Sequence, residues 1–82
     1  MNRETTRVIK ILEELSARVG LKLRHAEDQH QAAQDRAEAA AGNERQIALE
    51  KRIAARWARE AAADQRIIKM LHTDKRTVEL SN

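Results

Sequence analysis

The six residues AAAGNE, at positions 39–44, decide the fold of this chain. Gly42 suits the left-handed position that follows a helix C-terminus. Asn43 can cap a new helix, and Glu44 then lies in its first turn beside the positive end of the helix dipole. The chain contains no proline, and its other glycine is Gly20. The stretch therefore predicts a turn at residues 42–43 between two long helices.

Apolar residues recur every seven positions on both sides of this turn. On the N-terminal side the repeat consists of Leu12, Val19, Ala26, Ala33 and Ala40, flanked by Ile9, Leu23, His30 and Ala37. On the C-terminal side it consists of Ile47, Ala54, Ala61 and Ile68. A strict seven-residue repeat is typical of coiled-coil packing. We predict an all-α fold, a long helical hairpin whose two helices form an antiparallel coiled coil with an alanine-rich seam.

The expected organisation is a single helical domain over residues 1–82. The first helix spans about 5–41 and is capped by Thr5 or Thr6, and the second spans about 44–72. The polar stretch 73–82 is expected to fray. A break at Gly20 would give three helices instead. Residues 21–24 (LKLR) supply no cap for a new helix, and a glycine inside a helix costs only about 1 kcal/mol, so we favour the continuous helix.

The composition limits stability and excludes several classes of protein. A chain of 82 residues whose only aromatic residue is Trp57 builds a weak core, which favours oligomerisation or partner docking. Cysteine is absent, which excludes disulfides and thiolate chemistry. No apolar run approaches the roughly 20 residues that span a membrane, and the N-terminus does not resemble a signal peptide. We expect a cytoplasmic protein, encoded by a bacterium, phage or plasmid.

The most hydrophobic stretch, residues 6–23, presents an aliphatic face too wide for one partner helix. We expect this face to make the chain a homodimer, a four-helix bundle. The predicted self-association residues are Val8, Ile9, Leu12, Leu15, Val19, Ile68 and Leu71.

Arginines form a second pattern on the C-terminal helix. Arg45, Arg52, Arg59 and Arg66 are seven apart and lie opposite the apolar repeat, with Arg56 beside them. Such a row could grip carboxylates of a protein or follow a phosphate backbone. It could equally be a solvated face neutralised by Glu50, Glu60 and Asp64. Trp57 follows Arg56, and tryptophan and arginine are the commonest hot-spot residues of interfaces. Trp57 could instead belong to the core.

No pattern of catalytic or metal-binding residues is present. His25 and His30 are five apart and point in different directions on a helix, and His72 is remote. Glu13-Glu14 and Glu27-Asp28 are adjacent pairs that diverge on a helix. We predict no catalytic residue, no metal and no cofactor, and that the chain is not an enzyme.

The resulting hypothesis is a small, basic protein-binding module with a net charge of +3. It would act as an adaptor or inhibitor of the anti-defence type, docking through Arg45, Arg52, Arg56, Trp57, Arg59 and Arg66 and occluding its target. One alternative is a nucleic-acid-binding accessory protein that uses the same arginines. Another is a structural coiled-coil component.

Overall fold

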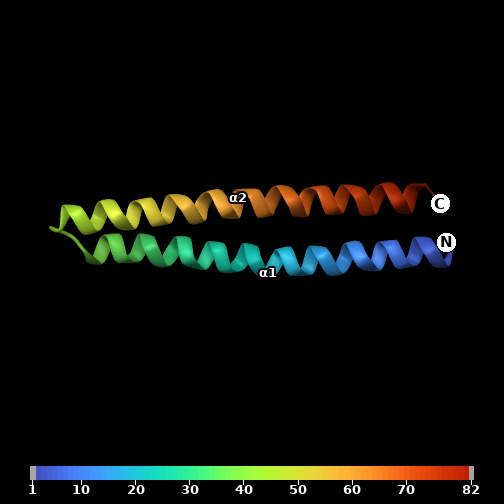
Figure 1. Cartoon of the computed structure of the whole chain (residues 1–82), viewed down its shortest axis with the longest axis horizontal. Coiled ribbons are helices and arrows are strands. Elements are labelled where there is room, and N and C mark those ends of the chain that lie inside the picture. Colours follow the sequence, from blue (N-terminus) through green and yellow to red (C-terminus); the bar gives the residue numbers. More distant parts are fainter. Residues whose placement is uncertain (1, 82) are drawn as a thin grey trace.

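The computed structural model describes residues 2–81, and it contains two α-helices of 37 residues each. Helix α1 spans Arg3–Ala39 and helix α2 spans Glu44–Leu80. They lie side by side and antiparallel, joined by one short turn, so that both termini are at the same end of a rod (Figure 1). The Cα positions extend over 62 × 14 × 11 Å. The predicted all-α helical hairpin is confirmed.

The turn forms at the AAAGNE stretch, but α1 ends at Ala39, two residues earlier than predicted, so the turn spans residues 40–43 and not only 42–43. Gly42 has φ +91°, in the left-handed region that favours glycine. The amide of Asn43 donates to the carbonyl of Ala40 at 2.8 Å. The side-chain oxygen of Asn43 accepts from the amide of Gln46 at 3.1 Å and so caps α2.

One row of side chains on each helix faces the other helix, and its members are alternately three and four residues apart. On α1 the row is Ile9, Leu12, Ser16, Val19, Leu23, Ala26, His30, Ala33, Ala37 and Ala40. On α2 it is Ile47, Glu50, Ala54, Trp57, Ala61, Asp64, Ile68, Leu71, Lys75 and Val78. Every member is buried or half-buried. These two rows, which we call the seam, contain all the apolar repeats found in the sequence.

Gly20 does not interrupt α1, so the three-helix alternative is wrong. Val19 and Leu23 both remain in the seam, which requires continuous helical geometry between them. The packing on either side of the glycine therefore outweighs its low helix propensity.

The N-terminal end of α1 lies earlier than predicted. Asn2, and not Thr5 or Thr6, is the cap, and its side-chain oxygen accepts from the amide of Thr5 at 2.8 Å. The hydroxyl of Thr6 donates to the backbone carbonyl of Asn2 at 3.1 Å. Asparagine is among the best capping residues, so the helix gains two residues.

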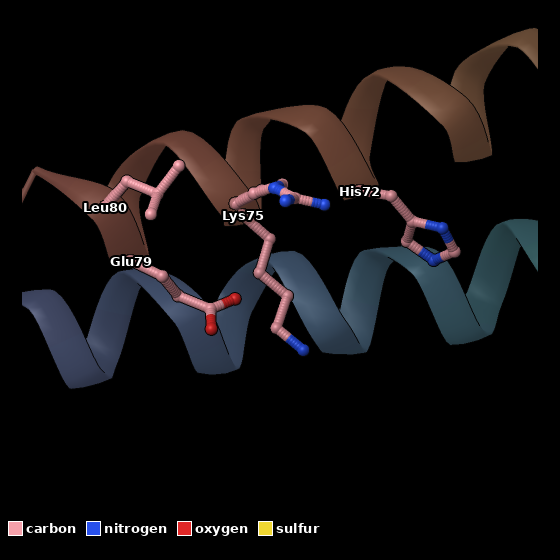
Figure 2. A pocket seen from close by; sticks show the side chains of 5 residues that line it. His72, Lys75, Glu79 and Leu80 are labelled. Atoms are coloured by element: carbon pink, nitrogen blue, oxygen red, sulfur yellow. The ribbon is translucent and has the colours of Figure 1, made fainter.

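The C-terminal end of α2 lies later than predicted, because residues 73–80 are helical and not frayed. Lys75 and Val78 continue the seam for two more turns. The ammonium of Lys75 lies 2.9 Å from the carboxylate of Glu13 on α1. Figure 2 shows Lys75 extending from α2 toward α1. These contacts across the open end hold the stretch that looked like a polar tail.

The core of the hairpin is thin. Among residues 2–81 the buried apolar residues are Ala26, Ala33 and Ala54, and the other buried residues are the acids Glu50 and Asp64. The large aliphatic side chains of the seam are only half-buried, since two helices cannot enclose them.

Candidate partner-binding face

The predicted arginine row lies on the side of α2 that faces away from α1. Arg45, Arg52, Arg59 and Arg66 are all exposed, and so is Arg56. Because their seven-residue spacing matches the seam repeat, the row runs parallel to the long axis with steps of about 10.5 Å.

Two further cations, Lys69 and Arg76, lie within about 60° of the same outward direction. We call the whole set the outer cationic face: Arg45, Arg52, Arg56, Arg59, Arg66, Lys69 and Arg76. It runs for about 46 Å along α2.

The carboxylates of α2 are all excluded from this face. Within Glu44–Leu80, Glu50 and Asp64 lie in the seam, and the others lie in the columns beside it: Glu44, Glu60, Asp74 and Glu79. The charges are therefore unevenly shared between the helices. Helix α1 carries seven basic and seven acidic residues, whereas α2 carries nine basic and six acidic residues, so α2 accounts for the net charge of +3.

The arginines of this face have no ion-pair partner among residues 2–81. The salt bridges in that part of the chain are Lys22–Asp64, Arg36–Glu50 and Lys75–Glu13. Of the three acids that could neutralise the arginine row, Glu50 and Asp64 pair with α1 instead, and Glu60 forms no ion pair with the row within residues 2–81.

Glu50 is held by hydrogen bonds from both helices. Its Oε2 accepts from Nε of Arg36 on α1 at 2.9 Å, and its Oε1 accepts from Nε2 of Gln46 at 2.9 Å. The carboxylate is nearly buried, whereas about half of the Arg36 side chain is exposed. This bridge fixes the relative position of the helices near the turn.

Asp64 is the most deeply buried charged residue, at 1% exposure. One oxygen, Oδ1, lies 4.0 Å from Nζ of Lys22, whose side chain is 65% exposed. No donor among residues 2–81 forms a hydrogen bond with the other oxygen, Oδ2. A buried carboxylate with so few partners is destabilising.

Trp57 lies in the seam and not in the arginine row. Its ring meets the ring of His25 from α1 edge to face, with centroids 5.4 Å apart. The guanidinium of Arg56 lies 5.8 Å from the centroid of the same ring. Trp57 is therefore half-buried between the helices. Arg56, which contacts its ring, is exposed and belongs to the outer cationic face.

Apolar side chains lie among these cations. Leu49 is 49% exposed and Met70 is 63% exposed, and both occupy columns next to the arginine row. Ala48 and Ala55 form the column on the other flank. The face is thus mixed in character, with long cations over small and aliphatic side chains.

The predicted self-association residues fall into two groups. Five of them lie in the seam and are half-buried within the hairpin: Ile9, Leu12, Val19, Ile68 and Leu71. Val8 and Leu15 lie outside the seam and are exposed.

Shallow depressions run along the part of the hairpin that the structure describes, and three of them gather no set of groups with catalytic geometry. The one at the open end is lined by His72, Lys75, Arg76, Glu79 and Leu80 (Figure 2). The other two share His30, whose Nδ1 donates to the carbonyl of Ala54 at 2.9 Å. His30, which flanks the apolar repeat in the sequence, is therefore a polar residue of the seam.

Residues 2–81 contain no cluster of three or more His, Asp or Glu side chains able to hold a metal ion. In the same part of the chain, neither helix has an apolar segment long enough to cross a bilayer.

The arginine row and the seam repeats were visible in the sequence, and the core was one of the two positions predicted for Trp57, but the seam positions of Glu50 and Asp64 were missed. The seven-residue repeat of α2 itself indicates these seam positions. Adding three residues to each member of the repeat Ile47, Ala54, Ala61 gives positions 50, 57 and 64, the other half of a heptad seam.

Comparison with known proteins found no match to this chain among protein-family models, curated proteins or solved structures.

Proposed function

We propose that this chain is a non-enzymatic binding module that docks on an acidic surface of a larger protein through the outer cationic face of α2. The observation that carries the proposal is the sorting of charge on α2. Its exposed outward arginines have no carboxylate beside them on that face, and they form no ion pair within residues 2–81.

Arginine suits this role because its planar guanidinium binds carboxylates through two parallel hydrogen bonds. The side chains project from one rigid helix at regular steps, so the backbone of the face needs no ordering on binding. A partner with acidic groups spaced along a helix or groove would match the row.

The apolar side chains of the face favour a protein partner. Interfaces between proteins are enriched in arginine and methionine, and they bury apolar side chains at their centre. Leu49 and Met70 supply such groups beside the cations. A surface that binds only phosphates gains no affinity from exposed apolar side chains.

The mechanism that we propose is occlusion. A rod 62 Å long can cover a functional surface of a partner without any chemistry of its own. Phages and plasmids encode small inhibitors and adaptors of this size, including anti-defence proteins, and we assign the chain to that class, acting in the cytoplasm.

The test is affinity capture from nuclease-treated extract of the producing cells, with matched charge variants. The bait is the wild type, an Arg52→Glu/Arg59→Glu variant of α2, or an Arg7→Glu/Arg24→Glu variant of α1. Both variants change the net charge equally, and all four arginines are exposed. We expect a protein retained by the wild type and by the α1 variant but lost by the α2 variant. Equal retention by both variants would contradict the proposal.

The second candidate is binding to a nucleic-acid backbone, favoured by the same absence of carboxylates from the outer cationic face. The ring of Trp57 packs against His25 in the seam and is not presented for base stacking. This candidate therefore requires contact with phosphates and not with bases. It predicts that labelled duplex DNA binds with an affinity that falls steeply with salt. Fluorescence anisotropy at low and moderate salt, with the two charge variants alongside, separates the candidates.

A further inference from the structure

An aliphatic patch remains uncovered at the open end of the hairpin. Val8, Ile11 and Leu15 on α1 are 42%, 49% and 40% exposed. Ile67 and Met70 on α2 are 39% and 63% exposed. Burying a side chain of this size stabilises a protein by roughly 1.5–3 kcal/mol, so the patch holds a large unused contribution.

The members of the patch lie on one side of the seam. Arg36 and Gln46 both donate to the carboxylate of Glu50, so their columns flank the seam on the same side. Val8 and Leu15 belong to the column of Arg36, at multiples of seven residues, and Ile67 belongs to the column of Gln46. The apolar side chains of the two helices therefore lie on the same side of the seam.

The order of residues on α1 indicates what covers this surface. Glu4, Val8, Ile11, Leu15 and Arg18 follow one another at steps of four and three residues, and all are exposed. We call this set the N-terminal ridge. It begins with an acid, ends with a cation and has three aliphatic residues between them.

This order is self-complementary for two antiparallel copies. Glu4 and Arg18 each lie seven residues, or about 10.5 Å, from Ile11. A twofold axis at Ile11 places Glu4 of one copy opposite Arg18 of the other, at both ends of the contact. Val8 then faces Leu15, and Ile11 faces Ile11. Such an isologous contact is the commonest symmetry of protein dimers.

We propose that the N-terminal ridge is the dimer interface of this protein and that a second copy of the chain binds it in antiparallel orientation, with Ile67 packing alongside. The arginines near the turn, Arg45 to Arg59, lie at the far end of each copy and stay exposed. The inference does not rest on the proposed function.

The test is the molar mass by sedimentation equilibrium over micromolar to millimolar concentration. The wild type is expected to approach twice 9.4 kDa. Ile11→Glu is expected to stay at 9.4 kDa while keeping its helical circular dichroism, because Ile11 is half-exposed in the hairpin. Leu21→Glu is the matched control, since Leu21 is 68% exposed and lies off the ridge.

Charge variants test the antiparallel order. Arg18→Glu alone places like charges opposite each other at both ends, and we expect the dissociation constant to rise about tenfold. The double variant Glu4→Arg/Arg18→Glu restores opposite charges and should restore the wild-type constant. A wild type that is monomeric at millimolar concentration would overturn the proposal, and so would a dimer unaffected by Ile11→Glu. Failure of the double variant to recover would overturn the antiparallel orientation.

Discussion

The carboxylates of Glu50 and Asp64 are buried in the seam, so that the negative charge of these two residues is absent from the outer cationic face of α2. Both occupy seam positions, and both point to cations of α1. With these two acids turned inward, the outer cationic face has no internal counter-charge. Their environments differ, however, because Glu50 accepts two hydrogen bonds whereas one oxygen of Asp64 accepts none within residues 2–81.

Disrupting the Glu50 bridge should destabilise the hairpin. Arg36→Ala leaves a nearly buried carboxylate with only Gln46 as donor, and we expect the free energy of unfolding to fall by about 1–3 kcal/mol. Arg24→Ala, an exposed arginine of the same helix, is the control and should change it by less than about 0.5 kcal/mol. Urea denaturation followed by circular dichroism measures both. An Arg36→Ala protein as stable as the control would show that the bridge contributes nothing.

Replacing Asp64 should stabilise the hairpin. Asp64→Leu removes a buried, poorly partnered carboxylate from a seam position and supplies an apolar side chain. Replacing buried charges by apolar residues raises stability by about 1–4 kcal/mol in favourable cases. Asp74→Leu, at an exposed position of α2, is the matched control. A drop in the denaturation midpoint of the Asp64→Leu variant would contradict this account of the residue.

At the scale of the helices, we expect substitution to alanine to change the free energy of unfolding in opposite directions at Gly20 and at Gly42. A Cβ atom at Gly20 would meet nothing within 4 Å, so Gly20→Ala should raise the free energy of unfolding by about 0.4–1 kcal/mol. Gly42 has φ +91°, where an L side chain is strained, so Gly42→Ala should lower it by about 1–2 kcal/mol. Thermal unfolding of the two variants tests the pair. Equal shifts in the same direction would contradict the assigned conformations.

At the open end of the hairpin, α1 and α2 are joined by a salt bridge between Glu13 and Lys75, and its contribution to stability depends on pH. The hydrogen bond to Glu13, together with its charge, raises the pKa of Lys75 above its ordinary value, and Glu79 adds a smaller effect. A raised pKa in the folded state means that the bond contributes fully below the unfolded pKa, about 10.4. The contribution is lost as the pH rises through the pKa of the folded state.

Glu13→Gln should therefore destabilise the hairpin at pH 8, and the difference from the wild type should shrink above about pH 10.4. Glu14→Gln, a change of the adjacent exposed carboxylate, should show neither effect. Thermal melts across this pH range measure the difference. A difference that persists unchanged to the highest pH would show that the charge of Lys75 is not its cause.

The helices themselves were largely predictable, because glycine, the asparagine cap and the seven-residue repeats act locally. The residues at which the helices begin and end were less predictable. The extension of α2 to Leu80 depends on Lys75 reaching Glu13, which is 62 residues away in the chain. The outward direction of the arginine row followed from the repeat. The inward direction of Glu50 and Asp64 also follows from the other half of that repeat, but we did not predict it, because charged residues at seam positions contradict the usual apolar pattern.

At the scale of the whole molecule, the hairpin separates three surfaces. The seam holds the helices together, the N-terminal ridge lies at the open end, and the outer cationic face runs along the back of α2. We propose that a partner binds the third of these surfaces, the outer cationic face.

Site-specific photo-crosslinking tests this claim most directly. A photoreactive residue is placed at Ala55, between Arg52 and Arg59 on α2, or at Ala17, an exposed alanine in the equivalent column of α1. Each protein is irradiated in extract of the producing cells. The account predicts a discrete crosslinked protein from position 55 that is absent from position 17 and is lost when Arg52 and Arg59 are changed to glutamate. Crosslinks from position 17 alone, or from both positions alike, would contradict it.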